Sequence, residues 1–179
     1  MRNFKSEGII IKRRNFGEAD RIITIFTKYH GKIQAKAMGV RKITSRRSSH
    51  MELLNLVSFN FYKGRTMPLV LETQTVENFS GMKDDLTKIG FAFHICELVD
   101  GLCPDNQESQ EIFMLLHTTL KRLERAEDIV EVIHAFEIKL LTLLGFWKQG
   151  SVQSSNTRVV IEEILERKLK SRQLFAKLS

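Results

Sequence analysis

The chain of 179 residues has few cysteines and no long apolar run. Its two cysteines, Cys96 and Cys103, are too few for a disulfide framework, which indicates a reducing, cytoplasmic setting. The longest apolar runs are only a few residues long, so we expect no transmembrane helix. The N-terminal sequence MRNFKSEGIIIKRR lacks a sustained apolar segment with a small-residue cleavage site, and we predict no secretory signal. Apolar residues still make up 42% of the chain, enough for a packed core.

The common signatures of catalysis are also missing. The sequence contains no Gly-rich phosphate loop, no HExxH motif and no nucleophile elbow. His94, His117 and His134 fall within helical patterns, where a structural histidine is the simpler interpretation. The pairs Asp84–Asp85 and Glu162–Glu163 lie near predicted helix starts, where acids are stabilising. Without a second Cys pair, the two cysteines predict buried thiols and no zinc site. We therefore expect neither an enzyme nor a metal or cofactor site.

Acidic residues are absent from one long part of the chain. No Asp or Glu occurs from Arg21 to Met51. The same stretch contains eight basic residues: Arg21, Lys28, Lys32, Lys36, Arg41, Lys42, Arg46 and Arg47. The net charge is +9 over residues 1–80, −5 over 81–150 and +3 over 151–179. A basic part followed by an acidic part predicts two units with different partners, the first partner being polyanionic.

The first 80 residues have the pattern of short strands. Candidate strands lie at 8–14, 21–27, 33–38, 53–62 and 69–79, separated by turn-like sequences such as YHGK and KGRTMP. In the fourth, Val57, Phe59 and Phe61 fall on one side. Five short strands in one small unit predict a barrel or a sandwich. The acid-free stretch between the third and fourth strands contains Gly39 and a Ser/Thr cluster, which predicts a long loop.

From residue 81 onward the period becomes helical. Apolar residues recur at helical spacing over 86–102, 112–123 and 129–144, and Gly145 is expected to end the third helix. Three helices of this length can pack as a bundle. Residues 148–156 are polar and predict a linker, and 157–178 have the pattern of a final amphipathic helix. The predicted organisation is α+β: a domain of residues 1–80 followed by a helical domain of residues 81–179.

The basic residues of the first domain are the strongest functional signal. A solvated loop without a partner is the plain alternative, but uncompensated cations suit a nucleic-acid backbone, whose binding releases counterions. The candidate phosphate contacts are Lys12, Arg13, Arg14, Arg21, Lys32, Lys36, Arg41, Lys42, Arg46, Arg47, Lys63 and Arg65, with hydroxyls from Ser45, Ser48 and Ser49. Phe16, Tyr29 and Tyr62 lie near turns and could stack on bases, although a place in the core or at its rim is the commoner role.

Several motifs resemble the RecO family of bacterial DNA repair and recombination mediator proteins. In the first domain they are Glu7-Gly8, Gly17-Glu18-Ala19-Asp20-Arg21, Gly31-Lys32, Gly39-Val40-Arg41-Lys42 and Tyr62-Lys63-Gly64. Further on, ELVDGLCP at 97–104 and AFEIKLLTLLGF at 135–146 resemble the helical region of that family. The motifs keep the order of the family up to Phe146.

The resemblance implies an OB-fold for the first domain. It implies a protein that binds single- and double-stranded DNA, anneals complementary strands and helps load the RecA recombinase onto strands coated by single-strand-binding protein (SSB). The implied partners are RecR and the acidic C-terminal tail of SSB, in the bacterial cytoplasm at the nucleoid. No enzymatic turnover is implied.

The sequence departs from the family pattern in one place. Many members carry a four-cysteine zinc module after the position of Leu144-Gly145, whereas WKQGSVQSSNTRVV at 147–160 contains no cysteine. The chain continues almost directly to what resembles the last helix of the family, around Leu169-Lys170-Ser171-Arg172. We therefore predict no structural zinc, and expect stability to come from packing of the last helix on the bundle.

Two other functions remain open at this point. The chain could be an adaptor whose basic loop docks an acidic peptide such as the SSB tail, with DNA binding incidental. Lys121, Arg122 and Arg125 could also receive such a tail, although ordinary surface charge near the end of a helix is the simpler interpretation. An RNA-binding regulator on the same barrel is the third possibility, because the contacts that distinguish RNA from DNA leave no motif here.

Overall fold

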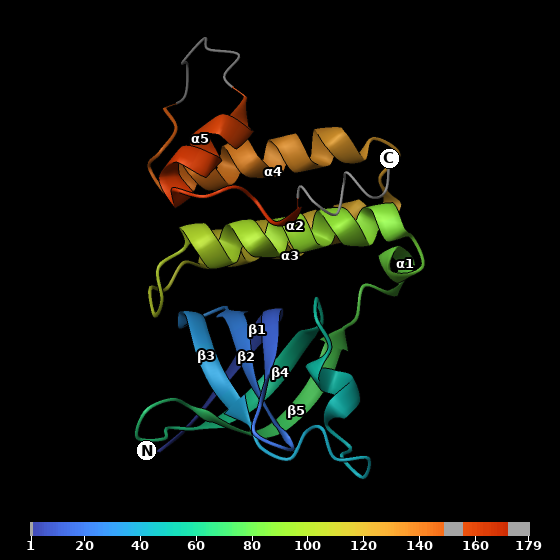
Figure 1. Cartoon of the computed structure of the whole chain (residues 1–179), viewed down its shortest axis with the longest axis vertical. Coiled ribbons are helices and arrows are strands. Elements are labelled where there is room, and N and C mark those ends of the chain that lie inside the picture. Colours follow the sequence, from blue (N-terminus) through green and yellow to red (C-terminus); the bar gives the residue numbers. More distant parts are fainter. Residues whose placement is uncertain (1, 149–155, 172–179) are drawn as a thin grey trace. The chain divides into compact units, whose positions relative to one another are not determined.

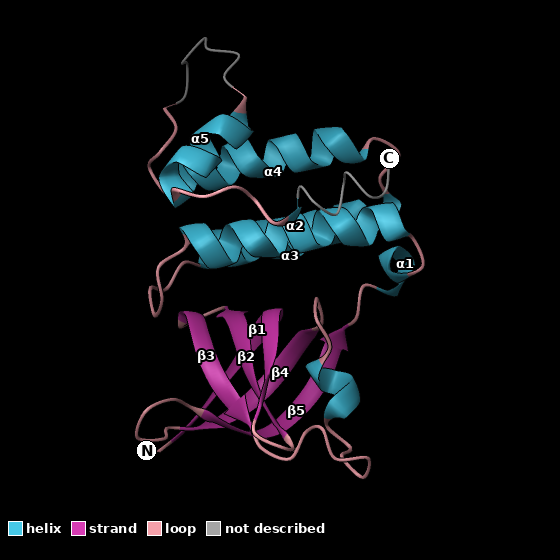
Figure 2. Ribbon diagram, viewed as in Figure 1, coloured by secondary structure: helices cyan, strands magenta, loops and turns pink. Residues whose placement is uncertain are grey.

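The computed structural model describes residues 2–148 and 156–171, with five strands followed by helices (Figures 1 and 2). The chain divides into two compact units. The first unit holds the residues up to Asn78 together with Pro104–Phe113, and the second holds the remainder. In the described part of the chain, every helix is too short or too polar to cross a membrane.

The first unit is a closed barrel of five strands. They are β1 (Asn3–Phe16), β2 (Asp20–Thr27), β3 (Gly31–Ala37), β4 (Leu56–Tyr62) and β5 (Leu69–Glu77), in the order β1-β2-β3-β5-β4. Neighbouring strands are antiparallel except β3 and β5, which pair in parallel at Lys36 and Leu69. A short 3-10 helix, η1 (Ser48–Met51), interrupts the long loop between β3 and β4. The predicted α+β class, with an OB-type barrel before the helices, is confirmed.

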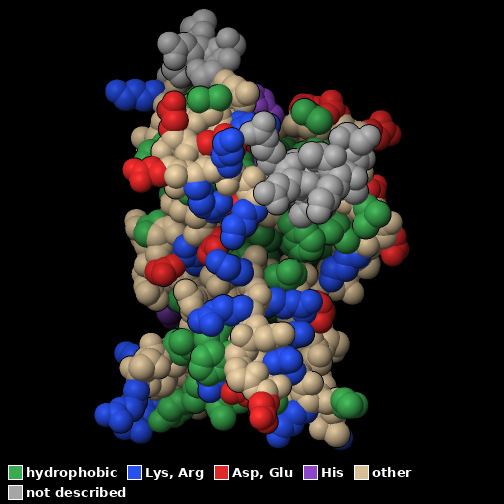
Figure 3. Space-filling view, in the orientation of Figure 1, with side chains coloured by type: hydrophobic (Ala, Val, Ile, Leu, Met, Phe, Trp, Pro, Cys, Tyr) green, Lys and Arg blue, Asp and Glu red, His purple; other side chains and the backbone are tan. Residues whose placement is uncertain are grey.

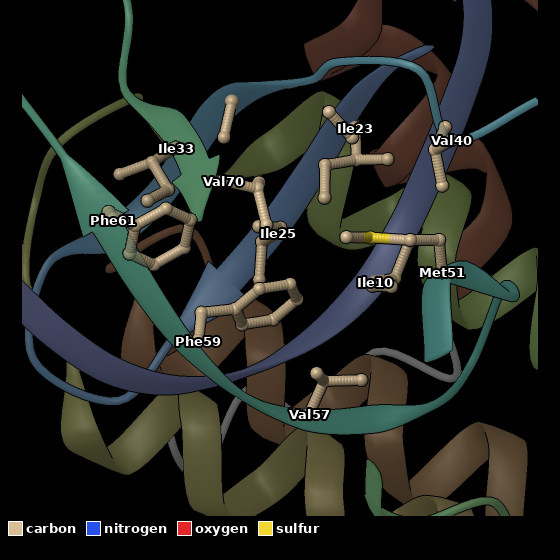
Figure 4. Packing of buried hydrophobic residues seen from close by; sticks show 12 residues of the cluster. Ile10, Ile23, Ile25, Ile33, Val40, Met51, Val57, Phe59, Phe61 and Val70 are labelled. Carbon is tan, nitrogen blue, oxygen red and sulfur yellow. The ribbon is translucent and has the colours of Figure 1, made fainter. Parts of the chain in front are cut away.

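The barrel is closed around an apolar core. The predicted alternation in β4 is confirmed, because Val57, Phe59 and Phe61 are all fully buried. The rings of Phe59 and Phe61 stack with centroids 5.1 Å apart, beside Ile25 of β2 (Figure 4). Each such side chain contributes roughly 1.5–3 kcal/mol by leaving water. This packing fixes which face of each strand points outward.

The segment Pro104–Phe113 completes the barrel unit. The backbone N–H of Asn106 donates to the carbonyl of Lys32 at 2.8 Å, and the Lys32 ammonium lies 3.2 Å from the Asp105 carboxylate. Gly31 has φ +65°, and a Cβ there would lie 2.0 Å from the carbonyl oxygen of Gln107. Only glycine permits this close approach. The motif Gly31-Lys32 therefore forms the contact between β3 and this segment.

The second unit consists of helices with well-formed ends. They are α1 (Ser80–Lys83), α2 (Leu86–Leu102), α3 (Gln110–Arg125), of which residues from Met114 belong to this unit, α4 (Ile129–Leu143) and α5 (Thr157–Leu165). Asp85 caps α2 by accepting from the N–H groups of Thr87 and Lys88, which agrees with its predicted role at a helix start. Gly145 follows α4 with φ +80°, the left-handed conformation expected of a glycine that ends a helix.

The last predicted helix is shorter than expected. The sequence pattern predicts a helix over 157–178, but α5 ends at Leu165 because Glu166 adopts a left-handed φ of 52°. The chain then turns back toward α2. Residues 172–178 of the prediction, and most of the predicted linker 148–156, lie outside the described residues.

A carboxylate on α2 holds this returning segment. Glu97 accepts hydrogen bonds from Arg167 Nη1 at 2.7 Å and from the backbone N–H groups of Lys170 and Ser171 at 2.7 and 2.8 Å. Burial alone would raise the pKa of Glu97, but these hydrogen bonds outweigh it and lower the pKa to about 2. The charged carboxylate thus stabilises the fold at neutral pH.

A buried histidine joins three parts of the same unit. His94 Nδ1 lies 2.8 Å from Ser171 Oγ, and its Nε2 lies 2.7 Å from Glu137 Oε1 on α4. The other oxygen of Glu137 accepts from the hydroxyl of Thr157, at the start of α5. His94 is therefore a structural histidine, as the sequence predicts. Cys96, two residues after His94 on α2, is a buried free thiol, and burial raises its pKa to about 12.

Replacement of Glu97 by glutamine tests whether its charge stabilises the contact with the segment after α5. We expect Glu97→Gln to lower the free energy of unfolding by about 1–3 kcal/mol at pH 7, because a neutral amide is a weaker acceptor. The folded pKa lies below the ordinary value of 4.5, so the contribution is full above about pH 5 and is lost as pH falls toward 2. Urea denaturation of both proteins over this pH range should show the difference shrinking; a constant difference would contradict the role of the charge.

Candidate nucleic-acid interface

A bulge in β1 decides which of its basic residues face outward. The pairing register with β2 shifts between Ile10 and Lys12. Beyond the shift, Arg13 pairs with Ile23, whose side chain lies in the core. Because successive side chains alternate between the faces of a strand, Lys12 and Arg14 lie on the outer face of the sheet. Both side chains are exposed.

The same outer face continues across β2 to β3. Ile22 pairs with Arg14 on one side and with Lys36 on the other, so all three residues lie in one row. The Lys36 ammonium is 3.0 Å from Asp20 Oδ2 and 4.9 Å from the ring centroid of Phe16. The Phe16 ring is partly exposed at the end of β1. This row therefore offers two cations beside an aromatic ring.

Asp20 fixes the start of the long loop that follows β3. Its Oδ1 accepts from the backbone N–H of Gly39 at 2.8 Å, while its other oxygen pairs with Lys36. The hydrogen bond from Gly39, followed by that from Lys36, lowers the pKa of Asp20, so the carboxylate is charged at neutral pH. The acid that immediately precedes the acid-free stretch thus folds back onto it.

Arg47 fixes the far end of the loop. Its Nη1 donates to the carbonyls of Val70 and Leu71 at 2.9 and 3.3 Å, and its Nη2 donates to the carbonyl of Met38 at 2.6 Å. The planar guanidinium can satisfy three carbonyls because its donors are set in a rigid fork. Arg47 thus holds the loop against β5 and the end of β3. Its predicted phosphate contact would require these hydrogen bonds to break.

Cations between these two anchors point into solvent. Lys42 and Arg46 are exposed and line a shallow hollow of about 480 Å³ together with Thr44 and Ser45. Among the residues that the structure describes, none bonds to the Arg46 side chain. Arg41 is also exposed, with one Nη1 donation to the carbonyl of Gly17 at 3.1 Å. The loop therefore presents exposed cations around a hollow that Asp20 also lines.

Two predicted contacts are engaged in ion pairs with protein carboxylates, and a third is partly buried. Arg13 forms an ion pair with Glu52 at 2.8 Å. The Lys32 side chain is only 9% exposed and pairs with Asp105, so it holds the segment Pro104–Phe113 against β3. Arg21 has a buried Nη1 without a hydrogen-bond partner among the described residues, and burial followed by repulsion from Arg13 lowers its pKa. These three residues are poor candidates for phosphate contacts.

The remaining predicted residues lie on the connecting loops. Lys63 and Arg65 are exposed in the β4–β5 connection, which reaches the end of β3 through a hydrogen bond from the N–H of Lys36 to the carbonyl of Pro68. Ser48 and Ser49 belong to η1. OB-folds bind oligonucleotides with the face of strands 2 and 3 and with the β1–β2 and β4–β5 loops, so the positions of Lys63 and Arg65 match that general site.

The three candidate aromatics are not gathered together. Phe16 stands at the β1–β2 turn beside Lys36. Tyr29 lies in the turn between β2 and β3, at the other end of β2, with Lys28 over its ring. The Tyr62 hydroxyl accepts a hydrogen bond from Arg2. Only Phe16 therefore adjoins the outer face that carries Arg14 and Lys36.

The basic cluster of the second unit is spread along the end of α3. Lys121, Arg122 and Arg125 are all exposed, and two of them lie in the last turn, where cations favour the helix dipole. On the side of the molecule shown in Figure 3, Lys and Arg side chains outnumber Asp and Glu over the barrel. The barrel face is therefore the stronger candidate for a polyanion.

These features define a class: an OB-type barrel with a basic outer face, followed by a helical unit. Two family models match the chain, Recombination protein O N terminal over residues 1–79 and Recombination protein O C terminal over residues 83–149. The chain belongs to the RecO family of DNA repair proteins.

Named relatives support the same family. The DNA repair protein RecO of Symbiobacterium thermophilum is 35% identical over 144 residues, which cover 80% of this chain and 57% of the relative. That of Acetivibrio thermocellus is 33% identical over 160 residues, covering 88% and 64%. That of Roseiflexus sp. is 35% identical over 148 residues, covering 83% and 52%. The chain thus matches between about half and two thirds of the length of these relatives.

The two neighbouring arginines of the loop should differ in their effect on stability. We expect Arg47→Ala to lower the free energy of unfolding by about 1–3 kcal/mol, because three carbonyls lose a charged donor. Arg46→Ala should change it by less than about 0.5 kcal/mol. Arg47→Lys should not restore stability, since an ammonium cannot reproduce the fork. Urea denaturation measures all three, and equal stability of the two alanine variants would refute the anchoring role.

Proposed function

We propose that this chain binds single- and double-stranded DNA through the outer face of β1–β3 and the adjoining loop. The observation that supports the proposal is the set of exposed cations on β1 and on two loops of the barrel, together with the partly exposed Lys36: Lys12, Arg14, Arg41, Lys42, Arg46, Lys63 and Arg65. Anchoring by Asp20 and Arg47 supports it further, because a loop that is already ordered loses less entropy on binding. Phosphate contacts carry no sequence information, so binding is independent of sequence.

The same surface suits annealing of complementary strands. Two strands repel each other through their phosphates, and a surface of fixed cations screens that repulsion while both are held. Family membership supports the wider role of a recombination mediator that acts with RecR and helps load RecA onto SSB-coated strands in the bacterial cytoplasm. No catalytic turnover is part of this proposal.

An acidic-peptide adaptor is the second candidate function. It is favoured by the hollow of the loop, where Lys42 and Arg46 lie beside the partly exposed Met38. An acidic peptide with apolar residues, such as the SSB tail, would suit that combination, and Lys121, Arg122 and Arg125 offer a separate basic surface. Competition between a labelled tail peptide and DNA distinguishes a shared site, where each displaces the other, from separate sites.

Charge reversal in the loop tests DNA binding directly. Wild-type affinity for a labelled single strand should fall with salt at a log–log slope of roughly −3.5, as expected for about five phosphate contacts. In Lys42→Glu/Arg46→Glu, with Arg47 left intact, we expect binding at least about tenfold weaker and a slope shallower by about 1.4. Fluorescence anisotropy over a salt series measures both quantities.

The matched control carries the same charge change on α3. Lys121→Glu/Arg122→Glu alters the net charge equally but leaves the barrel face unchanged. Its affinity and slope should stay close to those of the wild type. Equal losses in the two double variants would show that total charge, and not the loop, governs binding. A wild-type slope near zero would refute the electrostatic mechanism.

Annealing is measured separately with two complementary strands. Wild-type protein should increase the pairing rate of a donor- and an acceptor-labelled strand, because both bind one screened surface. Lys42→Glu/Arg46→Glu should bring the rate back toward that of the strands alone, and the α3 control should not. If the loop variant binds DNA weakly yet anneals at the wild-type rate, the annealing surface lies elsewhere.

A further inference from the structure

Ile43 stands out at the tip of the basic loop. Its relative exposure is 105%, so the whole side chain is in water. The other isoleucines of the acid-free stretch, Ile22, Ile23, Ile25 and Ile33, are each 5% exposed or less. A single exposed apolar side chain needs no explanation by itself. The anchored loop and the cations around Ile43, however, indicate a binding role.

The loop holds Ile43 away from the barrel. On one side, the N–H of Gly39 is bonded to Asp20 and the N–H of Arg41 donates to the carbonyl of Ala19 at 2.9 Å. On the other side, Arg47 is bonded to three carbonyls. A β-branched side chain is also restricted at χ1. Ile43 is therefore presented as a fairly rigid apolar contact.

Cations flank this apolar side chain. Lys42 precedes it and Arg46 follows it three residues later, and both side chains are exposed. Met38, which is 51% exposed, lines the same hollow as these two residues. The surface thus alternates charged and apolar groups over a few residues. A single strand of nucleic acid has the matching composition, because phosphates and unpaired bases alternate along it.

We propose that Ile43 packs against the bases of a single strand while Lys42 and Arg46 hold its phosphates. The proposal rests on the DNA binding proposed above and deepens it by naming the preferred form of DNA. Bases of a single strand expose their faces to such a contact, whereas those of a duplex are stacked on one another. Ile43 therefore favours single strands over duplexes, and adds a component of binding that salt does not screen.

The test compares variants of the full chain on three labelled ligands of equal length: oligo-dT, its abasic counterpart and a duplex. Ile43→Ser removes the apolar contact, and Ile43→Val retains most of it. Val130→Ser is the matched control, because Val130 is 68% exposed on α4 of the other unit. Anisotropy over a salt series gives affinity and slope, and thermal unfolding checks that every variant is folded. Full exposure of Ile43 makes loss of folding unexpected.

We expect Ile43→Ser to bind oligo-dT about threefold to tenfold more weakly than the wild type, at the low end of base-stacking effects. The salt slope should not change, because no cation is removed. Affinity for the abasic strand and for a duplex should stay at the wild-type level. Ile43→Val and Val130→Ser should resemble the wild type on every ligand.

Two results would overturn the inference while leaving the proposed function intact. Unchanged affinity of Ile43→Ser for oligo-dT would show that no base contact exists. An equal loss on oligo-dT and on the abasic strand would show that the substitution acts through the loop and not through bases. By contrast, the proposed DNA binding itself would be refuted if the wild-type protein bound neither strand. It would also be refuted if the protein bound an acidic peptide but no DNA.

Discussion

The arrangement of the basic face depends on the carboxylate of Asp20. This one group accepts from the N–H of Gly39 and pairs with Lys36, and so connects the β1–β2 turn to the start of the loop and to β3. Without it, a loop so rich in like charges would repel itself away from the barrel. Arg47 closes the other end through main-chain carbonyls, which carry no net charge. One acid and one arginine thus order a loop in which Lys42 and Arg46 stay exposed.

This arrangement explains how a loop of like charges can be ordered and still leave cations exposed for the polyanion proposed above. If every cation of the loop were paired with a protein carboxylate, phosphates would have to compete for each of them. Here the cations at the tip, Lys42 and Arg46, are spared, while those at the base are used for folding. For the DNA binding proposed above, we expect moderate affinity and ready release, because each phosphate contact would be exposed to solvent and screened by salt.

Local patterns predicted much of this fold, and contacts between distant residues account for the misses. The alternation of Val57, Phe59 and Phe61 identified a strand because period two needs only neighbouring residues. The sequence could not separate Arg46 from Arg47, since the carbonyls that bind Arg47 come from Met38, just after β3, and from two residues of β5. It likewise placed Lys32 among the phosphate contacts, because the acid that pairs with it follows α2. The end of the last helix was mispredicted for the same reason. The chain leaves the helix after Leu165, and the residues that follow donate hydrogen bonds to Glu97 on α2.

The insertion of Pro104–Phe113 into the barrel unit has a consequence for how the molecule can be divided. A fragment cut at residue 80 would contain all five strands, yet it would lack Asp105 and so lose the ion pair of the buried Lys32 ammonium. Loss of one partner of a buried ion pair is costly, so excision at the apparent boundary would weaken the strands that carry the basic face. During synthesis, too, the barrel reaches its final set of contacts only after α2 has left the ribosome. The two compact units are therefore interleaved in sequence.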